Sequence, residues 1–464
     1  MRRIAILLAG ALCSWEPAAA SPSFTGVGDL PGGTFSSGVN TFSGGALSAD
    51  GLVAAGVSDA GLGSDVGFRW EAGVMAPLII PGQPGFPDVT NTVPTALSSD
   101  GDVLVGYFPN GIPGGYPAGF RYVGDVLVST PLDPDGQLAS TLDDVDADGS
   151  VIVGTSAGGS WSFRWLRGAT PFSGAAAWLE SADTPYFDPM AGPLSTSADG
   201  SVVAGSYHDI FDPIPGNVAT IWQDGHLTVL GRLPGANSST SFGISADGST
   251  VVGVSGQVAF RWRAGTLTAL SAWPGGVYPS SALDTSADGR ITVGRYASPD
   301  WSGGALWVGT ELHRIEDFLD GAGVDYTGWT NLSPAAISDD GLTISGSGTN
   351  PNGDSEGWIA RVDGCSNGID DDGDGSSDFP ADPGCKEATS ALEQPRCQNG
   401  IDDDADGKID FDGGASLNGG VPVAPVDPPC TAAWKNQEKP KTCGLGAELL
   451  LALGVLATWR RRVG

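Results

Sequence analysis

Ser48-Ala49-Asp50-Gly51 is the first copy of a turn that recurs six more times along the chain. An Asp-Gly pair flanked by apolar residues is a strong hairpin signal, because Gly adopts positive φ at no steric cost and Asp bonds its own backbone. A second glycine follows the first by five residues in every copy, and the residues between them are mostly β-branched or apolar. The first glycines of the seven copies are Gly51, Gly101, Gly149, Gly200, Gly248, Gly289 and Gly341.

Each turn belongs to a repeating unit whose spacing runs from 41 to 52 residues. An aromatic strand follows the second glycine, as in Phe260-Arg261-Trp262, and a further apolar strand follows that, as in residues 227–230. With the strand before the turn, each unit has four strands, which is typical of a β-propeller blade. Solenoid repeats are shorter, so a β-helix is the weaker interpretation. The sequence therefore predicts an all-β fold, a seven-bladed β-propeller over residues 21–363.

The two ends of the repeat region predict that the ring is closed by the N-terminal strand. The seventh unit stops after its aromatic strand, residues 358–362, so its fourth strand is missing. Residues 24–32 resemble a fourth strand without the first three, and they share the Leu-Pro-Gly ending of residues 227–235. Pairing the first segment into the last sheet would remove an exposed edge.

The repeat resembles that of the bacterial extracellular HAF repeat proteins. Residues 243–248 with Gly253, followed by residues 259–262, are similar to that family's Ile-Ser-x-Asp-Gly-x-x-Val-Val-Gly and Ala-Phe-Arg-Trp pattern. The fourth and seventh units depart from the pattern, since they lack the Phe-Arg pair. The resemblance implies an exported repeat protein and no particular reaction.

Composition narrows the range of partners. The formal net charge is −32, which argues against a nucleic acid or an anionic lipid surface as partner. The three histidines, His208, His226 and His313, are far apart in sequence, so a histidine-based metal or acid–base centre is poorly supported.

The N-terminal segment predicts export. Residues 1–20 have a basic start, a short apolar run and an Ala-x-Ala end, which is typical of a signal peptide cut after Ala20. Lipidation at Cys13 is the lesser alternative, because Leu12 is bulky for the position before a lipidated cysteine.

Residues 364–435 form a tandem duplication that predicts calcium binding. In each copy carboxylates occupy positions 1, 3, 5 and 9 and Gly occupies position 6, as in the front of an EF-hand loop. The bidentate Glu of position 12 is missing, so the loops look more like thrombospondin type 3 or dockerin loops, with Asp382 or Asp412 as candidates to complete the shell. A solvated acidic linker is the alternative. The predicted ligands are Asp370, Asp372, Asp374, Ser376 and Asp378 in the first copy, and Asp402, Asp404, Asp406, Lys408 and Asp410 in the second.

Four cysteines in the same segment fit an oxidising compartment. Four cysteines allow three pairings. The simplest, given the duplication, joins Cys365 to Cys385 and Cys397 to Cys430. So small a segment needs disulfides and metal to stay folded.

A linker, residues 436–442, leads to the C-terminal segment 443–464. Cys443, an apolar run over residues 449–459 and three terminal arginines resemble C-terminal sorting signals of Gram-negative envelope proteins. We expect a membrane protease to cut near Cys443, with residues 449–459 contacting the membrane at least transiently as a hydrophobic helix. A plain single-span anchor is the alternative.

Ligand binding is expected in the loops that differ between units. The candidate residues are Tyr107, Tyr116, Tyr207, His208 and Trp301. The sequence favours an exported, non-catalytic protein of the cell surface or the secreted fraction that binds a glycan or a protein. A glycan hydrolase or lyase is one alternative, with Asp209, Asp212, His208 and Arg295 as loose candidates. A purely structural envelope protein is the other.

Overall fold

The computed structural model of the chain describes residues 22–32, 36–39, 46–61, 65–79, 91–109, 118–123, 126–129, 133–136, 139, 141–156, 161–167, 174–179, 191–209, 216–272, 279–298, 302–366, 375–386, 390, 393, 396–398, 400, 402, 407–418, 420–433 and 435. The chain divides into two compact units, one of Ser21–Gly368 and one that contains Ile369–Gly464 with Met1–Ala20. The predicted C-terminal helix, residues 443–464, lies outside the described residues.

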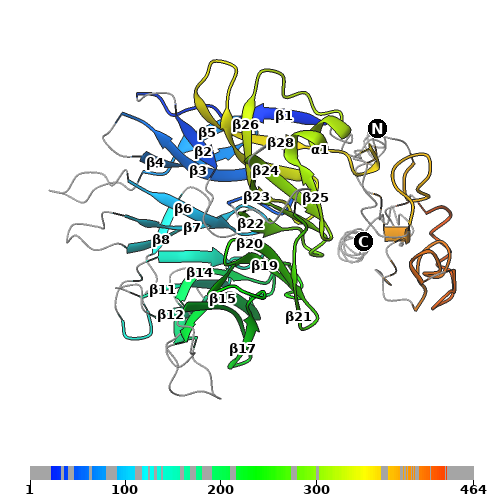
Figure 1. Cartoon of the computed structure of the whole chain (residues 1–464), viewed down its shortest axis with the longest axis horizontal. Helices are drawn as coiled ribbons and strands as arrows, with labels where there is room; N and C mark the ends of the chain where they lie inside the picture. The colour runs from blue at the N-terminus through cyan, green and yellow to red at the C-terminus, as the bar shows by residue number, and fades with distance from the viewer. Residues whose placement is uncertain are drawn as a thin grey trace, which may run out of the picture. The chain divides into compact units, whose positions relative to one another are not determined.

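The larger unit is the predicted seven-bladed β-propeller (Figure 1). It consists of seven sheets of four strands, and neighbouring strands in each sheet are antiparallel. We number the sheets one to seven by the order of their Asp-Gly turns. Sheets one to three contain β2 (Ser37–Val39), β3 (Val53–Asp59), β4 (Asp65–Glu71) and β5 (Val74–Pro77); β6 (Val93–Leu97), β7 (Val103–Phe108), β8 (Ala118–Val123) and β9 (Val126–Ser129); and β10 (Thr141–Val145), β11 (Val151–Thr155), β12 (Ser162–Arg167) and β13 (Gly174–Trp178).

The remaining sheets repeat the arrangement. Sheets four to six contain β14 (Ala191–Thr196), β15 (Val202–Asp209), β16 (Gly216–Gln223) and β17 (His226–Gly231); β18 (Ser239–Ile244), β19 (Thr250–Ser255), β20 (Val258–Arg263) and β21 (Thr266–Ala269); and β22 (Ser280–Thr285), β23 (Ile291–Ala297), β24 (Ser302–Val308) and β25 (Glu311–Arg314). Sheet seven contains β26 (Thr330–Ile337), β27 (Thr343–Thr349), β28 (Ser355–Arg361) and, from the start of the chain, β1 (Ser23–Gly26).

β1 closes the ring, as the sequence predicts. It pairs antiparallel with β28, with Ser23 opposite Arg361 and Gly26 opposite Trp358. The Phe24 ring stacks on the Trp358 ring at 5.4 Å between centroids. An apolar cluster then joins Val27 and Leu30, which follow β1, to residues of the first and seventh sheets.

The Asp-Gly turns join neighbouring sheets as well as neighbouring strands. In the fifth turn Ser245 Oγ donates to Asp247 Oδ1 (2.6 Å) and accepts the N–H of Thr250 (3.0 Å). The residue after the Ser or Asp also donates its N–H to the carbonyl of its counterpart in the next sheet. Five such bonds occur among the described residues, at 2.9–3.1 Å: Ala49 to Ser99, Ser99 to Ala147, Ala147 to Ala198, Ala198 to Ala246 and Ala287 to Asp339.

The second glycine of each unit allows close approach of two backbones. A Cβ added at Gly253 would lie 2.1 Å from the Thr240 carbonyl oxygen, and one at Gly294 would lie 2.1 Å from the Ser281 oxygen. The first strand is irregular at the same place, because the register shifts between Ser241 and Gly243. Close approach beside a bulge is therefore the reason that Gly stands inside these strands.

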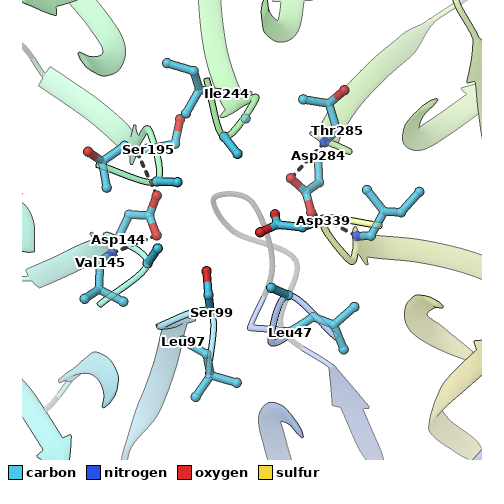
Figure 2. A pocket seen from close by; sticks show the side chains of 17 residues that line it. Leu47, Leu97, Ser99, Asp144, Val145, Ser195, Ile244, Asp284, Thr285 and Asp339 are labelled. Carbon is cyan, nitrogen blue, oxygen red and sulfur yellow. Dashed lines mark hydrogen bonds between the residues drawn. The ribbon is translucent and has the colours of Figure 1, made fainter. Parts of the chain in front are cut away.

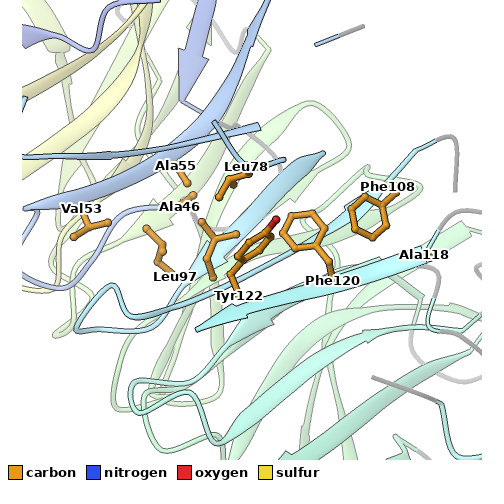
Figure 3. Packing of buried hydrophobic residues seen from close by; sticks show 10 residues of the cluster. Ala46, Val53, Ala55, Leu78, Leu97, Phe108, Ala118, Phe120 and Tyr122 are labelled. Atoms are coloured by element: carbon orange, nitrogen blue, oxygen red, sulfur yellow. The ribbon is translucent and has the colours of Figure 1, made fainter. Parts of the chain in front are cut away.

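The aromatic strands form the core between sheets (Figure 3). Phe108, Phe120 and Tyr122 of the second sheet pack in one cluster with Val53 and Ala55 of the first. The guanidinium of Arg121, which alternates with these rings along β8, lies over the Trp165 ring of the third sheet, 5.3 Å from its centroid.

One helix interrupts the described β-structure of this unit. α1 (Ile315–Gly321) lies between β25 and β26 and buries Ile315, Phe318 and Leu319. The spacing of these apolar residues places them on one face of the helix.

Candidate functional site

The first candidate site is a cavity on the axis of the propeller (Figure 2). Its volume is about 90 Å³, and all seven units contribute to its lining from the end of the first strand and the Asp-Gly turn. One position lies two residues before the Ser or Asp of each turn, and in four units its residue lines the cavity: Asp144, Ser195, Gly243 and Asp284. The corresponding residues of the other three units are Ala46, Ala96 and Ala336.

The two aspartates at this position bind the neighbouring sheet in the same way. Asp144 Oδ1 accepts the N–H of Val145 and its Oδ2 accepts the N–H of Thr196 in the next sheet, both at 2.8 Å. Asp284 Oδ1 accepts the N–H of Thr285 (2.8 Å) and its Oδ2 accepts the N–H of Ile337 in the seventh sheet (2.9 Å). Each carboxylate therefore joins two sheets beside the axis.

A third carboxylate lines the cavity from the seventh turn. Asp339 stands where the other turns have alanine or serine. Burial raises the pKa of Asp144 to about 7, although its two backbone hydrogen bonds act in the opposite direction. Burial also raises the pKa of Asp284 well above its ordinary value, with Asp339 and Asp144 adding to the rise, and raises the pKa of Asp339. The cavity is thus an acidic site in which burial disfavours the ionised form of the carboxyl groups.

Sequence analysis did not single out these three residues. When the units are aligned on their turns, each of these aspartates stands where the other units have mostly alanine, serine or glycine. This difference in side-chain type could have identified them from the sequence. Asp144 and Asp284 belong to no recognisable motif, and Asp339 occupies the variable second position of the seventh turn.

The second candidate site is an open groove of about 490 Å³ beside the fifth, sixth and seventh sheets. It lies at the ends of the strands remote from the Asp-Gly turns, since its lining comes from the start of β22 and β24 and the end of β23. The exposed Arg295 lines it and donates from Nε to Ser333 Oγ at 3.0 Å. Gln257, Ser281 and Ser302 add further polar groups.

The predicted ligand-binding residues are distributed over several places. Tyr107 is partly buried in β7, and burial, followed by the negative charge of Asp143, raises its pKa. Tyr207 is only 4% exposed and packs within β15. His208 and Asp209 lie in β15 opposite Asn217 and Gly216. Tyr116, Asp212 and Trp301 lie outside the described residues. Of the sequence candidates, Arg295 lines the groove.

The third candidate site is the duplicated acidic segment. Of its predicted ligands, Asp370, Asp372, Asp374, Asp404 and Asp406 lie outside the described residues. Asp402, at position 1 of the second loop, accepts the N–H of Gly407, at position 6, through Oδ2 at 2.8 Å. The carboxylate of position 1 therefore contacts the backbone of the glycine that a calcium loop needs for its sharp turn.

The two copies share positive φ at positions 6 and 9 of the predicted loops. Gly375 and Gly407 have φ of 94° and 86°, and the position 9 residues Asp378 and Asp410 have φ of 54° and 50°. Ser376 and Lys408 stand between them at position 7.

The two candidates to complete the calcium shell, Asp412 and Asp382, have different surroundings. Asp412 Oδ1 accepts the N–H groups of Gly414 and Ala415 at 3.0 Å, and its Oδ2 accepts that of Ser416 at 2.8 Å, so this carboxylate caps a turn. Asp382 lies with Glu393 and Cys385 in one buried cluster, whose oxygen and sulfur atoms are within 4.8 Å of one another.

The cysteines of the segment are oxidised. Cys397 and Cys430 form a disulfide, with a Cα–Cα distance of 5.4 Å, which confirms the predicted pairing in the second copy. Cys365 and Cys385 are disulfide-bonded as well. The sulfur of Cys385 is therefore no thiolate ligand for a metal.

The predicted processing sites, Ala20 and Cys443, and the apolar run 449–459 lie outside the described residues. Within the part of the chain that the structure describes, none of the helices has the length and apolar character needed to cross a membrane.

Comparison with known protein sequences does not assign the chain to a family. No known family pattern matches the chain, and no curated protein matches it. The resemblance to HAF repeat proteins accordingly stays a prediction.

Three solved structures illustrate the likeness in fold. The propeller domain of the Trilobed protease from Pyrococcus furiosus is 12% identical, with a TM-score of 0.42, over 69% of this chain and 95% of that domain. A TolB-type protein from Agrobacterium tumefaciens is 16% identical (TM-score 0.32; 45% of this chain and 69% of that one). TolB from Acinetobacter baumannii is 17% identical (TM-score 0.35; 56% and 55%). Such distant likenesses carry no argument about what this chain does.

Proposed function

We propose that this protein is an exported, non-catalytic β-propeller of the cell envelope, the cell surface or the secreted fraction, which binds a glycan or another protein. The observation that carries the proposal is the open groove around Arg295, in which a few polar groups lie on a mostly apolar lining. The guanidinium is held by Ser333 through Nε alone among the described contacts, so its terminal nitrogens remain as donors for a ligand. Oxidised cysteines support export.

The groove favours binding over hydrolysis. Glycoside hydrolysis needs two carboxyl groups on either side of the scissile bond. The described residues that line the groove supply hydroxyl, amide and guanidinium groups and include no carboxylate. A groove with several hydroxyl groups and one guanidinium group suits a sugar or a peptide that carries a hydrogen-bond acceptor.

The test compares two arginine substitutions at opposite ends of β23. Arg295→Ala and Arg290→Ala remove the same charge, but Arg290 follows the sixth Asp-Gly turn and pairs with Asp288. The full chain and both variants would be applied to an array of neutral and acidic glycans and to immobilised envelope proteins. Arg295→Ala should weaken binding about tenfold or more, as expected for a lost charged hydrogen bond. Equal binding by Arg295→Ala and the parent chain, or equal losses in both variants, would contradict the proposal.

We propose further that calcium stabilises the duplicated acidic segment. The Asp402–Gly407 hydrogen bond supports this, because it brings the position 1 carboxylate to the glycine of position 6. Calorimetry of the full chain with calcium tests it. Asp370→Asn/Asp402→Asn should lower the heat and the stoichiometry of binding, whereas Asp102→Asn/Asp317→Asn, which removes two exposed charges elsewhere, should leave them unchanged. Identical titrations for both double variants would contradict a role for the loops.

A further inference from the structure

The groove that carries the proposed function contains a positive charge with no acidic neighbour among the described residues. Arg295 lines the groove and forms no ion pair within the described part of the chain. Other arginines face carboxylates, since Arg290 contacts Asp288 at 3.3 Å and Arg361 lies 4.0 Å from Asp340. The chain has 54 acidic residues against 22 lysines and arginines, so a guanidinium in a groove without a described carboxylate is an unneutralised positive charge.

The guanidinium of Arg295 is oriented by one hydrogen bond that leaves its outer edge available. Nε donates to Ser333 Oγ of the seventh sheet at 3.0 Å, and no described residue accepts from Nη1 or Nη2. The donors of a guanidinium form a rigid fork, and the two terminal nitrogens can bind both oxygens of one carboxylate. Although much of the side chain is exposed, the groove withdraws part of it from water, which lowers the pKa of Arg295. Attraction between opposite charges is stronger in such surroundings than in bulk water.

The groups around Arg295 suit the hydroxyls and the ring faces of a sugar. Ser281 is directly opposite Arg295 in the β22–β23 pair, so the two side chains lie on the same face of the sheet. Gln257 and Ser302 are exposed in the same groove. Hydroxyl and amide groups both donate and accept hydrogen bonds, as sugar hydroxyls do. Pro279 and the other apolar lining residues offer a surface for the C–H face of a ring, and a volume of about 490 Å³ is that of a small-molecule site.

The backbone of the groove is less suited to an extended peptide. Peptides in extended form commonly bind by adding a strand to an exposed sheet edge through main-chain hydrogen bonds. Here Ser280 N donates to Gln257 O and Ala297 N donates to Pro279 O, both at 2.8 Å. These backbone groups are already bonded, so recognition in the groove depends on side chains. This favours a saccharide over a peptide.

We propose that the groove binds a saccharide that carries a carboxylate, such as an oligouronide, with Nη1 and Nη2 of Arg295 donating to the two carboxylate oxygens. The inference rests on the proposed function, because it assigns a ligand class to the same groove. Gln257, Ser281 and Ser302 bind sugar hydroxyls, and the apolar lining contacts a ring face. The net charge of −32 repels acidic ligands from the rest of the molecule, so the acidic group is recognised at Arg295.

Calorimetry of the full chain with trigalacturonate and with its fully methyl-esterified form tests the role of the carboxylate. The two ligands share rings and hydroxyls and differ in charge. EDTA is present, so that calcium cannot bridge an acidic sugar to an acidic protein. We expect the acid to bind about tenfold more tightly than the ester, as for a charged hydrogen bond, and to weaken as salt is added. Equal affinity for acid and ester would overturn the carboxylate assignment and leave the groove as a glycan site. No binding of either ligand, while Arg295→Ala still loses another glycan or a protein on the array, would overturn the ligand class and leave the proposed function standing.

Variants of the fork separate its geometry from its charge. Arg295→Lys keeps the charge but not the two parallel donors, so it should lose most of the preference for the acid. Arg295→Gln should bind acid and ester alike, and Ser333→Ala should weaken the acid severalfold because Nε is no longer held. Arg290→Ala, at the other end of β23, should bind as the parent chain does. A preference for the acid that survives in Arg295→Gln, or hexaglutamate bound as tightly as trigalacturonate, would overturn the proposal.

Discussion

Arg361, near the end of the last strand of the ring, donates from Nη1 to the carbonyl oxygen of Asp50 in the first Asp-Gly turn at 3.3 Å. The equivalent contact occurs between two sheets that are consecutive in sequence, where Arg263 reaches Asp288 O at 3.3 Å. Arg69, two positions earlier in its own strand, makes a related contact with Gly101 O at 3.4 Å. The interface between the last and first sheets is therefore built like the others, although its two halves are more than 300 residues apart.

Phe24→Ala should weaken the closing strand. Phe24 contacts the rings of Trp358 and Trp329, with centroids 5.4 and 5.1 Å away. Loss of a partly buried aromatic ring should lower the free energy of unfolding by about 2 kcal/mol. Urea denaturation measures this change in the free energy of unfolding. Thr25→Ala is the control because Thr25 is exposed in the same strand, and equal stability of the two variants would mean that β1 does not hold the ring shut.

Ser98→Ala should destabilise the second turn. Ser98 Oγ accepts the N–H of Val103 at 2.9 Å and donates to Asp100 Oδ1 at 2.6 Å. The substitution leaves a buried N–H unsatisfied, which costs about 1–3 kcal/mol. Asp102→Ala, at an exposed position of the same turn, should change stability by less than about 0.5 kcal/mol. Denaturation curves that coincide for the two variants would argue that the hydroxyl is not structural.

Gly253→Ala should be far more damaging than Gly265→Ala. A methyl at Gly253 would collide with the Thr240 carbonyl oxygen, whereas Gly265 has φ of 80° and nothing within 4 Å of an added Cβ. The collision should cost roughly 3 kcal/mol or more, and the left-handed backbone alone about 1 kcal/mol. Circular dichroism melting of the two variants compares them. A milder loss at Gly253 would mean that the strands can separate there.

Stability should fall as the pH rises through the range in which the axial carboxylates titrate. Asp144 has an ordinary value of 3.8 and a folded pKa of about 7, so the unfolded chain releases this proton first. Its contribution is complete below about pH 4 and is lost as the pH passes about 7. Asp143, whose pKa burial also raises to about 7, adds to the trend.

Urea denaturation in EDTA at several pH values measures this slope. Asp144→Asn should lose stability less steeply between these limits than the parent chain, and Asp102→Asn should follow the parent. Parallel curves for the parent and Asp144→Asn would show that Asp144 does not titrate in this range.

The fold could be predicted because its determinants are local and repeated. Asp-Gly turns, β-branched strands and the orphan segment before the first unit together define seven sheets and a closed ring. α1 was not predicted, since Ile315, Phe318 and Leu319 form too short a pattern to separate from a strand and loop.

The axial residues were harder to predict because their chemistry depends on where the ring axis lies. Asp144 and Asp284 look like ordinary surface aspartates in a chain with 54 acidic residues. Only the bulged first strand and its approach to the next sheet turn them toward the cavity. Arg295 was a loose candidate for catalysis from the sequence, and the structure places it in the lining of the open groove.

The pairing of β1 with β28 also dictates an order of events during biosynthesis. β1 is synthesised long before β28 and stays unpaired until residues 355–361 have been synthesised. The other blades can form from neighbouring strands, but the last one cannot form before residues 355–361 have been synthesised, and such distant contacts form slowly. Closure of the ring is therefore a late step of assembly, which joins the first strand of the propeller to the last blade.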